Sequence, residues 1–151
     1  MRKGIGLAFS LLVVLGLSGA NAQVITGDSI FESLALEPGD PARGRAIVAS
    51  RQTGLCLLCH SGPFPEERFQ GNLAPELKAS VARLNAPQLR ARIVNAAHFN
   101  PQTIMPAYYQ TSHLNRVALK FTGQTILNGQ EIEDVIAFLL TLNNPNELTS
   151  R

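Results

Sequence analysis

Sulfur-containing and imidazole side chains are scarce in this chain, and their few positions limit its chemistry. The 151 residues include only two cysteines, two methionines and three histidines. We find no Ser/His/Asp set and no paired carboxylates of the kind that hydrolytic enzymes use. Beyond the N-terminus no apolar run approaches the about 20 residues of a membrane-spanning helix. The composition predicts one small domain whose most informative side chains are these sulfur and imidazole groups.

Both cysteines lie in the sequence Cys56-Leu57-Leu58-Cys59-His60. This Cys-x-x-Cys-His pattern is typical of covalent c-type haem attachment. Two thiols at this spacing reach the two vinyl groups of one porphyrin, and the next residue places an imidazole nitrogen on the iron. We therefore predict one haem c, bound through thioethers to Cys56 and Cys59 and ligated by His60. Both thiols of the chain are used by this attachment.

Two other interpretations of the cysteine pair remain open. A Cys-x-x-Cys sequence can form a redox disulfide or half of a zinc site. A thioredoxin-like site would follow a strand within a βαβ unit, and no such context is evident. A zinc site needs two further ligands, and only His98 and His113 remain, neither at zinc-finger spacing.

The N-terminus has the pattern of a secretory signal peptide. Arg2 and Lys3 precede an apolar run over 5–17, and Ala20-Asn21-Ala22 has the small-x-small pattern of a cleavage site. The alternative is an uncleaved membrane anchor, for which the apolar run is short. We expect residues 1–22 to be removed on export to the periplasm, with no membrane insertion afterwards.

Charge is unevenly distributed along the rest of the chain. Without Arg2 and Lys3 the basic count falls from 13 to 11, which equals the 11 acidic residues. Ten of the basic residues but only three acids lie between Arg43 and Lys120. A basic segment of this kind is either ordinary solvated surface or attracts an acidic partner or an anionic substrate. Nucleic acid is not an expected partner of an exported haem protein without net positive charge.

Local patterns predict a small all-α fold around one cofactor. Asp40 and Pro41 suit the cap and first position of a helix that runs to Ala49. A second predicted helix starts after Asn85. A third follows the capping box of Asn128 and Glu131 and carries an apolar stripe at helical spacing: Ile132, Val135, Ile136, Leu139 and Leu140. We expect Gly44 to let the first and last helices approach closely, and residues 116–127 to form a short β-hairpin.

Met105 is the only methionine left after signal removal, and it precedes Pro106. A thioether is a soft iron ligand, and the proline prevents a helix there, so Met105 is presented from a rigid loop. We predict that Met105 is the sixth iron ligand. The alternatives are that Met105 only fills the core or that His98 or His113 ligates instead. Candidate partners of the haem propionates are Arg83, Arg90, Arg92, Tyr108 and Tyr109.

The haem motif, Met105 and a proline-bearing segment at 73–77 together resemble class I cytochromes c. In that family the carbonyl corresponding to Pro75 orients the haem histidine. The flanking sequences over 39–45, 54–63 and 103–109 closely resemble SoxX, the monohaem subunit of the SoxAX cytochrome, and the resemblance covers most of the predicted mature chain.

The resemblance implies a partner and a reaction. SoxX pairs with SoxA, which carries its own haem and a reactive cysteine. The complex couples thiosulfate oxidatively to a cysteine of the carrier protein SoxYZ, and electrons leave to a small cytochrome. This chain would then transfer electrons through a haem ligated by His60 and Met105. The expected organisation is a signal peptide (1–22), an N-terminal arm (23–39) and a cytochrome c domain (40–151).

Two other functions remain open at this stage. The chain can be a free-standing periplasmic electron shuttle that binds its partners transiently. Less consistent with Met105 is a gas-binding haem sensor with an open sixth site.

Overall fold

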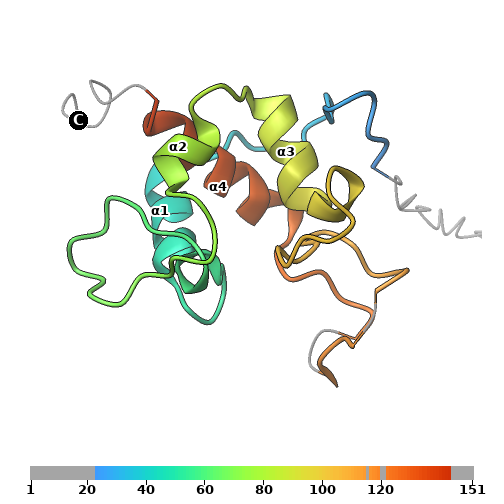
Figure 1. Ribbon diagram of the computed structural model, residues 1–151. Coiled ribbons are helices and arrows are strands. Elements are labelled where there is room, and N and C mark those ends of the chain that lie inside the picture. Colours follow the sequence, from blue (N-terminus) through green and yellow to red (C-terminus); the bar gives the residue numbers. More distant parts are fainter. Residues whose placement is uncertain (1–22, 115, 120–121, 144–151) are drawn as a thin grey trace, which may run out of the picture.

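The computed structural model describes residues 23–114, 116–119 and 122–143. The predicted signal peptide lies outside these residues. The helices are α1 (Pro41–Ala49), α2 (Leu77–Val81), α3 (Ala86–Val94) and α4 (Gly129–Thr141), with short 3-10 turns η1 (Cys56–Leu58) and η2 (Ala96–His98). Figure 1 shows long irregular loops hanging from one side of the helical layer. The fold class predicted from the sequence, a small helical cytochrome c-like domain, is confirmed.

The first and last helices cross at glycine residues. A β-carbon at Gly44 would overlap the main-chain carbonyl oxygen of Asp134 in α4, and one at Gly39 would overlap that of Glu133. The two helix backbones are therefore in direct contact, which any larger residue would prevent. The predicted role of Gly44 in this crossing is confirmed.

Side-chain caps fix where three helices begin. The Asp40 side chain accepts the Arg43 N–H at 2.8 Å, with Pro41 at the first helical position of α1. Complete capping boxes start α3, where Asn85 pairs with Gln88, and α4, where Asn128 pairs with Glu131. All three predicted helix starts are confirmed.

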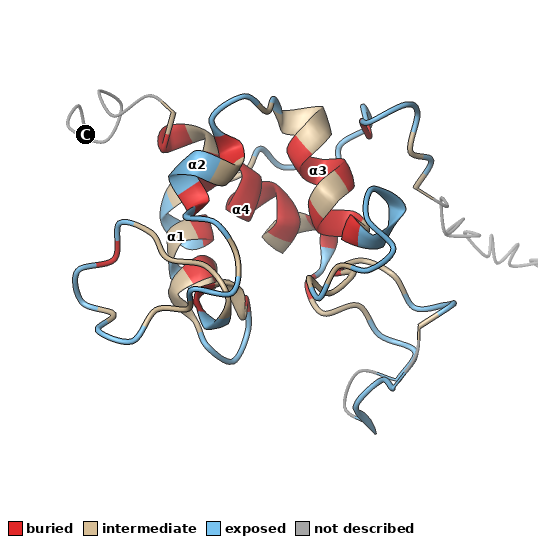
Figure 2. Cartoon of the chain, in the orientation of Figure 1, coloured by how far each residue is buried: buried red, intermediate tan, exposed pale blue. Residues whose placement is uncertain are grey.

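The hydrophobic core lies between α4 and the elements around it. Figure 2 shows buried residues concentrated on α4 and α3, whereas most of the loops are intermediate or exposed. Four of the five residues of the predicted stripe of α4 are buried: Ile132, Val135, Ile136 and Leu139. Leu140 packs against the core from a half-buried position. No helix in the described ranges is long and apolar enough to cross a membrane.

Residues 23–39 lie along α3 and α4 without regular structure beyond a single β-bridge between Thr26 and Ser29. Ile30 is buried, and its N–H donates to the Pro87 carbonyl at 3.0 Å. The Leu34 N–H donates to Glu133 at 3.0 Å. The arm thus packs onto its own domain.

The β-hairpin expected over 116–127 is not formed by the described residues of that segment. The N–H groups of Ile126 and Leu127 instead donate to the carbonyl of Tyr108, at 3.0 and 3.2 Å. The hairpin expectation was wrong because these donors pair with a distant loop rather than with a neighbouring strand.

Several arginines of the basic segment are neutralised by acids within the chain. Arg90 forms a buried two-point ion pair with Glu133, with N–O distances of 2.6 and 2.7 Å. Arg43, whose side chain is largely exposed, forms a two-point ion pair with the buried Asp134 at 2.7 and 2.8 Å. The basic segment and the acidic last helix are therefore partly joined to each other, and less of the positive charge faces solvent than the sequence suggests.

Candidate functional site

An apolar cavity of about 610 Å³ opens between the helices and the irregular loops. Its walls come from η1, from residues 73–77, from the 100–106 loop and from α1, α3 and α4. None of the described residues that line it is Asp, Glu, Lys or Arg. Ten of its side chains are Val, Leu or Ile: Val48, Leu55, Leu58, Leu73, Leu77, Ile93, Ile104, Leu127, Val135 and Leu139. This lining favours a large apolar ligand.

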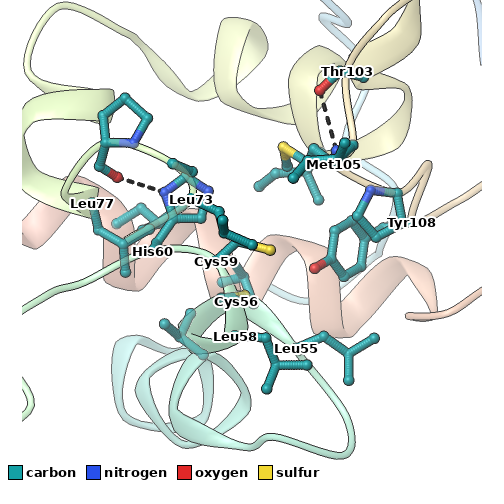
Figure 3. A pocket seen from close by; sticks show the side chains of 18 of the residues that line it. Leu55, Cys56, Leu58, Cys59, His60, Leu73, Leu77, Thr103, Met105 and Tyr108 are labelled. Carbon is teal, nitrogen blue, oxygen red and sulfur yellow. Dashed lines mark hydrogen bonds between the residues drawn. The ribbon is translucent and has the colours of Figure 1, made fainter. Parts of the chain in front are cut away.

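The cysteine motif forms one wall of the cavity, and its backbone is held firmly. Leu57 is buried as an anchor, with 1% of its surface exposed, and its carbonyl accepts the Gly71 N–H at 2.8 Å. The His60 N–H donates to the Cys56 carbonyl at 2.9 Å, so Cys56, Cys59 and His60 share one turn of chain. Figure 3 shows these three side chains gathered at the same end of the pocket.

The environment of Cys56 does not suit a redox thiol. Burial raises the pKa of this thiol to about 11, although the hydroxyl of Tyr108 acts in the opposite direction. Redox-active Cys-x-x-Cys pairs instead have lowered pKa values, which generate the nucleophilic thiolate. No disulfide joins Cys56 to Cys59 in the structure. The buried environment of Cys56 thus weighs against the redox-disulfide interpretation.

His60 is oriented by a backbone carbonyl. Its Nδ1 lies 2.6 Å from the carbonyl oxygen of Pro75. Because a carbonyl only accepts hydrogen bonds, Nδ1 carries the proton and Nε2 keeps its lone pair. A fixed tautomer of this kind is what a metal-ligating histidine needs. The contact between His60 and Pro75 that the family resemblance suggested is present.

Met105 lies on the opposite wall of the cavity from His60, with its thioether directed inward (Figure 3). Its N–H donates to the Thr103 hydroxyl at 3.2 Å, and the Thr103 N–H donates to the Asn100 carbonyl at 3.0 Å. These local hydrogen bonds hold the loop in a compact turn before Pro106. The cavity therefore presents an imidazole and a thioether from opposite sides.

The alternative iron ligands lie elsewhere. His98 is exposed in η2 and packs edge-on against Phe99, with ring centroids 5.1 Å apart. His113 is exposed in the 110–119 region. Neither residue lines the cavity. Within the described ranges, no group of three His, Cys, Asp or Glu residues is placed to hold a metal ion, so a zinc site receives no support.

Of the candidate propionate partners, only Tyr108 lines the cavity. Arg90 is committed to Glu133, and the Arg92 guanidinium lies 4.6 Å from the centre of the Phe99 ring. The sequence did not predict the ion pair of Arg90, because its partner Glu133 is 43 positions away in the chain.

Sequence reasoning also missed the central position of Tyr108. This residue is 4% exposed, and its hydroxyl donates to the Gly54 carbonyl at 2.6 Å. Burial raises its pKa far above the usual range, with the negative charge that Cys56 would carry as a second cause. No local signal distinguishes Tyr108 from its neighbour Tyr109 in the sequence.

Comparison with solved structures gives an informative likeness. No protein-family model and no curated protein sequence matches the chain. The crystal structure of SoxXA from P. pantotrophus contains a similar chain, with a TM-score of 0.72 and 35% sequence identity. The match covers 80% of this chain and 93% of that one. Likeness at this identity over nearly the whole relative goes beyond a shared fold, and the chain belongs to the SoxX family of cytochrome c-like proteins.

Proposed function

We propose that this chain is the monohaem c-type cytochrome subunit of a periplasmic SoxAX-like complex, in which it passes electrons. One observation carries the proposal: His60 and Met105 project from opposite walls of an uncharged cavity whose base holds Cys56 and Cys59. The likeness to a chain of SoxXA from P. pantotrophus supports the identity of the complex.

The residues present fit a covalently attached haem. The cavity volume lies within the range of about 300–1,000 Å³ typical of cofactor sites, and its wall is largely aliphatic. Cys56 and Cys59 would form the two thioethers, and Nε2 of His60 would ligate the iron. Bound haem would supply one-electron transfer between ferric and ferrous iron.

Met105 would supply the second protein ligand to the iron. A thioether is a soft ligand that raises the reduction potential of haem iron relative to a second imidazole. The hydrogen bonds of Thr103 hold the Met105 loop in a compact turn. A ready sixth ligand favours electron transfer over gas binding.

The sulfur chemistry would take place on the partner. With both cysteines committed to thioethers, the chain retains no thiol for bond formation with thiosulfate. We therefore assign the oxidative coupling of thiosulfate to a carrier cysteine to a SoxA-like subunit, with a SoxYZ-like protein as the carrier. Electrons would leave through this chain to a small cytochrome c acceptor. The chain itself would reach the periplasm by export with a cleaved signal peptide.

Haem attachment is tested by expression of the full chain with a bacterial cytochrome c maturation system. The wild type should retain haem on a denaturing gel, whereas Cys56→Ser/Cys59→Ser should retain none. His98→Ala is the matched control, because His98 lies outside the cavity, and it should retain haem fully. A double variant that still carries covalent haem would overturn the assignment.

The complex is tested by co-expression with a SoxA-like protein. A heterodimer that survives size-exclusion chromatography, with haem in both chains, is the expected result. A haem-loaded monomer that never associates would instead support a free-standing shuttle. Carbon monoxide binding to the reduced protein at neutral pH would support a sensor.

A further inference from the structure

Tyr108 joins the loop that carries Met105 to the segment that precedes the cysteine motif. Its side chain lines the cavity, and its hydroxyl donates to the carbonyl of Gly54 at 2.6 Å. Gly54 lies two positions before Cys56, and Tyr108 lies three positions after Met105. In Figure 3 the hydroxyl of Tyr108 points toward the part of the pocket where Cys56 lies. One hydrogen bond thus links the two walls of the cavity.

The acceptor of this hydrogen bond is fixed in position. Gly54 is buried, and a β-carbon there would overlap the carbonyl oxygen of Ile47 at the end of α1. The Gly54 segment is therefore packed directly against α1, which limits how far it can follow Tyr108 if the Met105 loop moves. A displaced loop would break the hydrogen bond rather than carry its acceptor along.

The Gly54 carbonyl has two donors in the unmodified chain. Besides Tyr108, the thiol of Cys56 donates to it, with a sulfur–oxygen distance of 3.2 Å. A thioether sulfur has no proton to donate. Once Cys56 is alkylated, Tyr108 becomes the remaining side-chain donor to this buried carbonyl among the described residues, and a buried carbonyl without a donor is costly.

The backbone of Tyr108 is also held by hydrogen bonds. Its N–H donates to the carbonyl of Ile93 in α3 at 3.1 Å, and its carbonyl accepts from Ile126 and Leu127 before α4. These bonds anchor the main chain from the helical side. The hydroxyl of Tyr108 is the group that hydrogen-bonds across to the motif side.

We propose that Tyr108 is a positioning residue that holds the Met105 loop closed against the haem motif and thereby stabilises thioether ligation. This inference rests on the proposed function, because it presupposes that Met105 binds the iron. Its consequence is specific: loss of the hydroxyl should ease replacement of Met105 by an external ligand.

The test is an imidazole titration of the haem-loaded ferric protein. Displacement of Met105 is followed by loss of the weak long-wavelength absorption band that a thioether ligand produces. Tyr108→Phe should reach half-displacement at about fivefold lower imidazole concentration, the equivalent of one net hydrogen bond. Tyr109→Phe removes the adjacent hydroxyl, which does not line the cavity, and should titrate like the wild type.

The outcomes separate three situations. A lowered melting temperature of Tyr108→Phe with unchanged imidazole affinity would reveal a purely structural residue and overturn the inference. A wild type that lacks the thioether band would show that Met105 does not ligate, so the proposed ligand set and the inference fail together. A wild type with the band and no difference between variants would overturn the role of Tyr108 alone.

A second measurement applies if Tyr108→Phe yields no haem-loaded protein. The chain has only two tyrosines, so biosynthetic incorporation of 3-fluorotyrosine into Tyr109→Phe modifies Tyr108 alone. The fluorinated phenol is a stronger hydrogen-bond donor. Met105 should then resist imidazole more than in unlabelled Tyr109→Phe, and unchanged or weaker resistance would overturn the inference.

Discussion

The cavity and the charged seam of the helical layer differ in their content of charged side chains. We define the charged seam as Arg43, Arg90, Glu133 and Asp134, which form two ion pairs between α4 and its neighbours. The cavity has no formally charged side chain among its described lining residues. The loops that form part of its wall are held by single hydrogen bonds, such as those to Pro75, Thr103 and Gly54.

The difference shows how a small domain can surround a large cofactor. Charges inside the cavity would have to be desolvated beside the ligand, at a high cost. Charges in the seam are satisfied by close partners and by backbone groups of the N-terminal arm. We therefore expect changes in the cavity to alter ligation, and changes in the seam to alter stability with little effect on ligation.

The largest expected effect is on the cavity side. Met105→Ala removes the proposed thioether, so the ferric protein should lose its long-wavelength band completely, and the reduction potential should fall. Absorption spectroscopy and a redox titration measure both. His113→Ala should change neither, because His113 lies outside the cavity. A Met105→Ala protein with an intact band would show that another residue ligates.

The second effect is on the seam. Glu133→Ala leaves Arg90 buried without its acid and should lower the free energy of unfolding by about 3–5 kcal/mol, as for other broken buried ion pairs. Urea denaturation of the haem-loaded protein measures the change. One control is Glu66→Ala, in the exposed pair with Arg45, whose free energy of unfolding should remain near that of the wild type. The other is Arg90→Met/Glu133→Leu, which removes both charges and should recover much of the lost stability.

The absorption spectrum of the Glu133→Ala protein tests whether the seam and the cavity are independent. The long-wavelength band of the folded variant should match that of the wild type, because Glu133 does not line the cavity. A lost band at full folding would show that the seam and the cavity are coupled.

The third effect concerns the helix crossing. Gly44→Ala improves helix propensity but places a β-carbon against the Asp134 carbonyl, and forced overpacking costs about 1–3 kcal/mol. The same denaturation experiment measures it. Ala46→Gly, at an exposed position of the same helix, should cost about 1 kcal/mol through propensity alone. A stabilised Gly44→Ala protein would show that the helices can separate without penalty.

The features that depend on residues close together in the chain, namely the helix starts and the apolar stripe of α4, were predicted from the sequence. The caps Asp40, Asn85 and Asn128 act within three residues of themselves, so each helix start followed from neighbours in the chain. The stripe on α4 depended only on helical periodicity. The general fold and the motif side of the site were therefore predictable.

The rest depends on partners that are distant in sequence. Ile126 and Leu127 resemble a hairpin strand, but their donors are taken by Tyr108. Arg90 was a propionate candidate until the structure placed Glu133 against it. Tyr108 contacts Gly54 across 54 positions. Nothing near any of these residues in the chain indicates its partner.

The smallest expected effect is the acid sensitivity of the seam at Asp134. Burial would raise the pKa of this carboxyl, but hydrogen bonds from Arg43, the Asp40 N–H and Gln130 outweigh it and lower the pKa. A lowered folded-state pKa stabilises the fold above the ordinary pKa of aspartate, near 4, and this stability is lost as the pH falls through the folded value. Asp134→Asn should therefore be less stable than wild type at neutral pH, and the two should converge in acid.

Urea midpoints from about pH 7 down to about pH 2 measure the convergence. Arg43→Gln is the informative companion, because it removes a main cause of the lowered pKa and should move the acid loss to higher pH. Two curves for wild type and Asp134→Asn that stay parallel at every pH would show that Asp134 titrates as in the unfolded chain. The Arg43–Asp134 pair would then add no charge-dependent stability, and the electrostatic contrast with the cavity would rest on Arg90 and Glu133 alone.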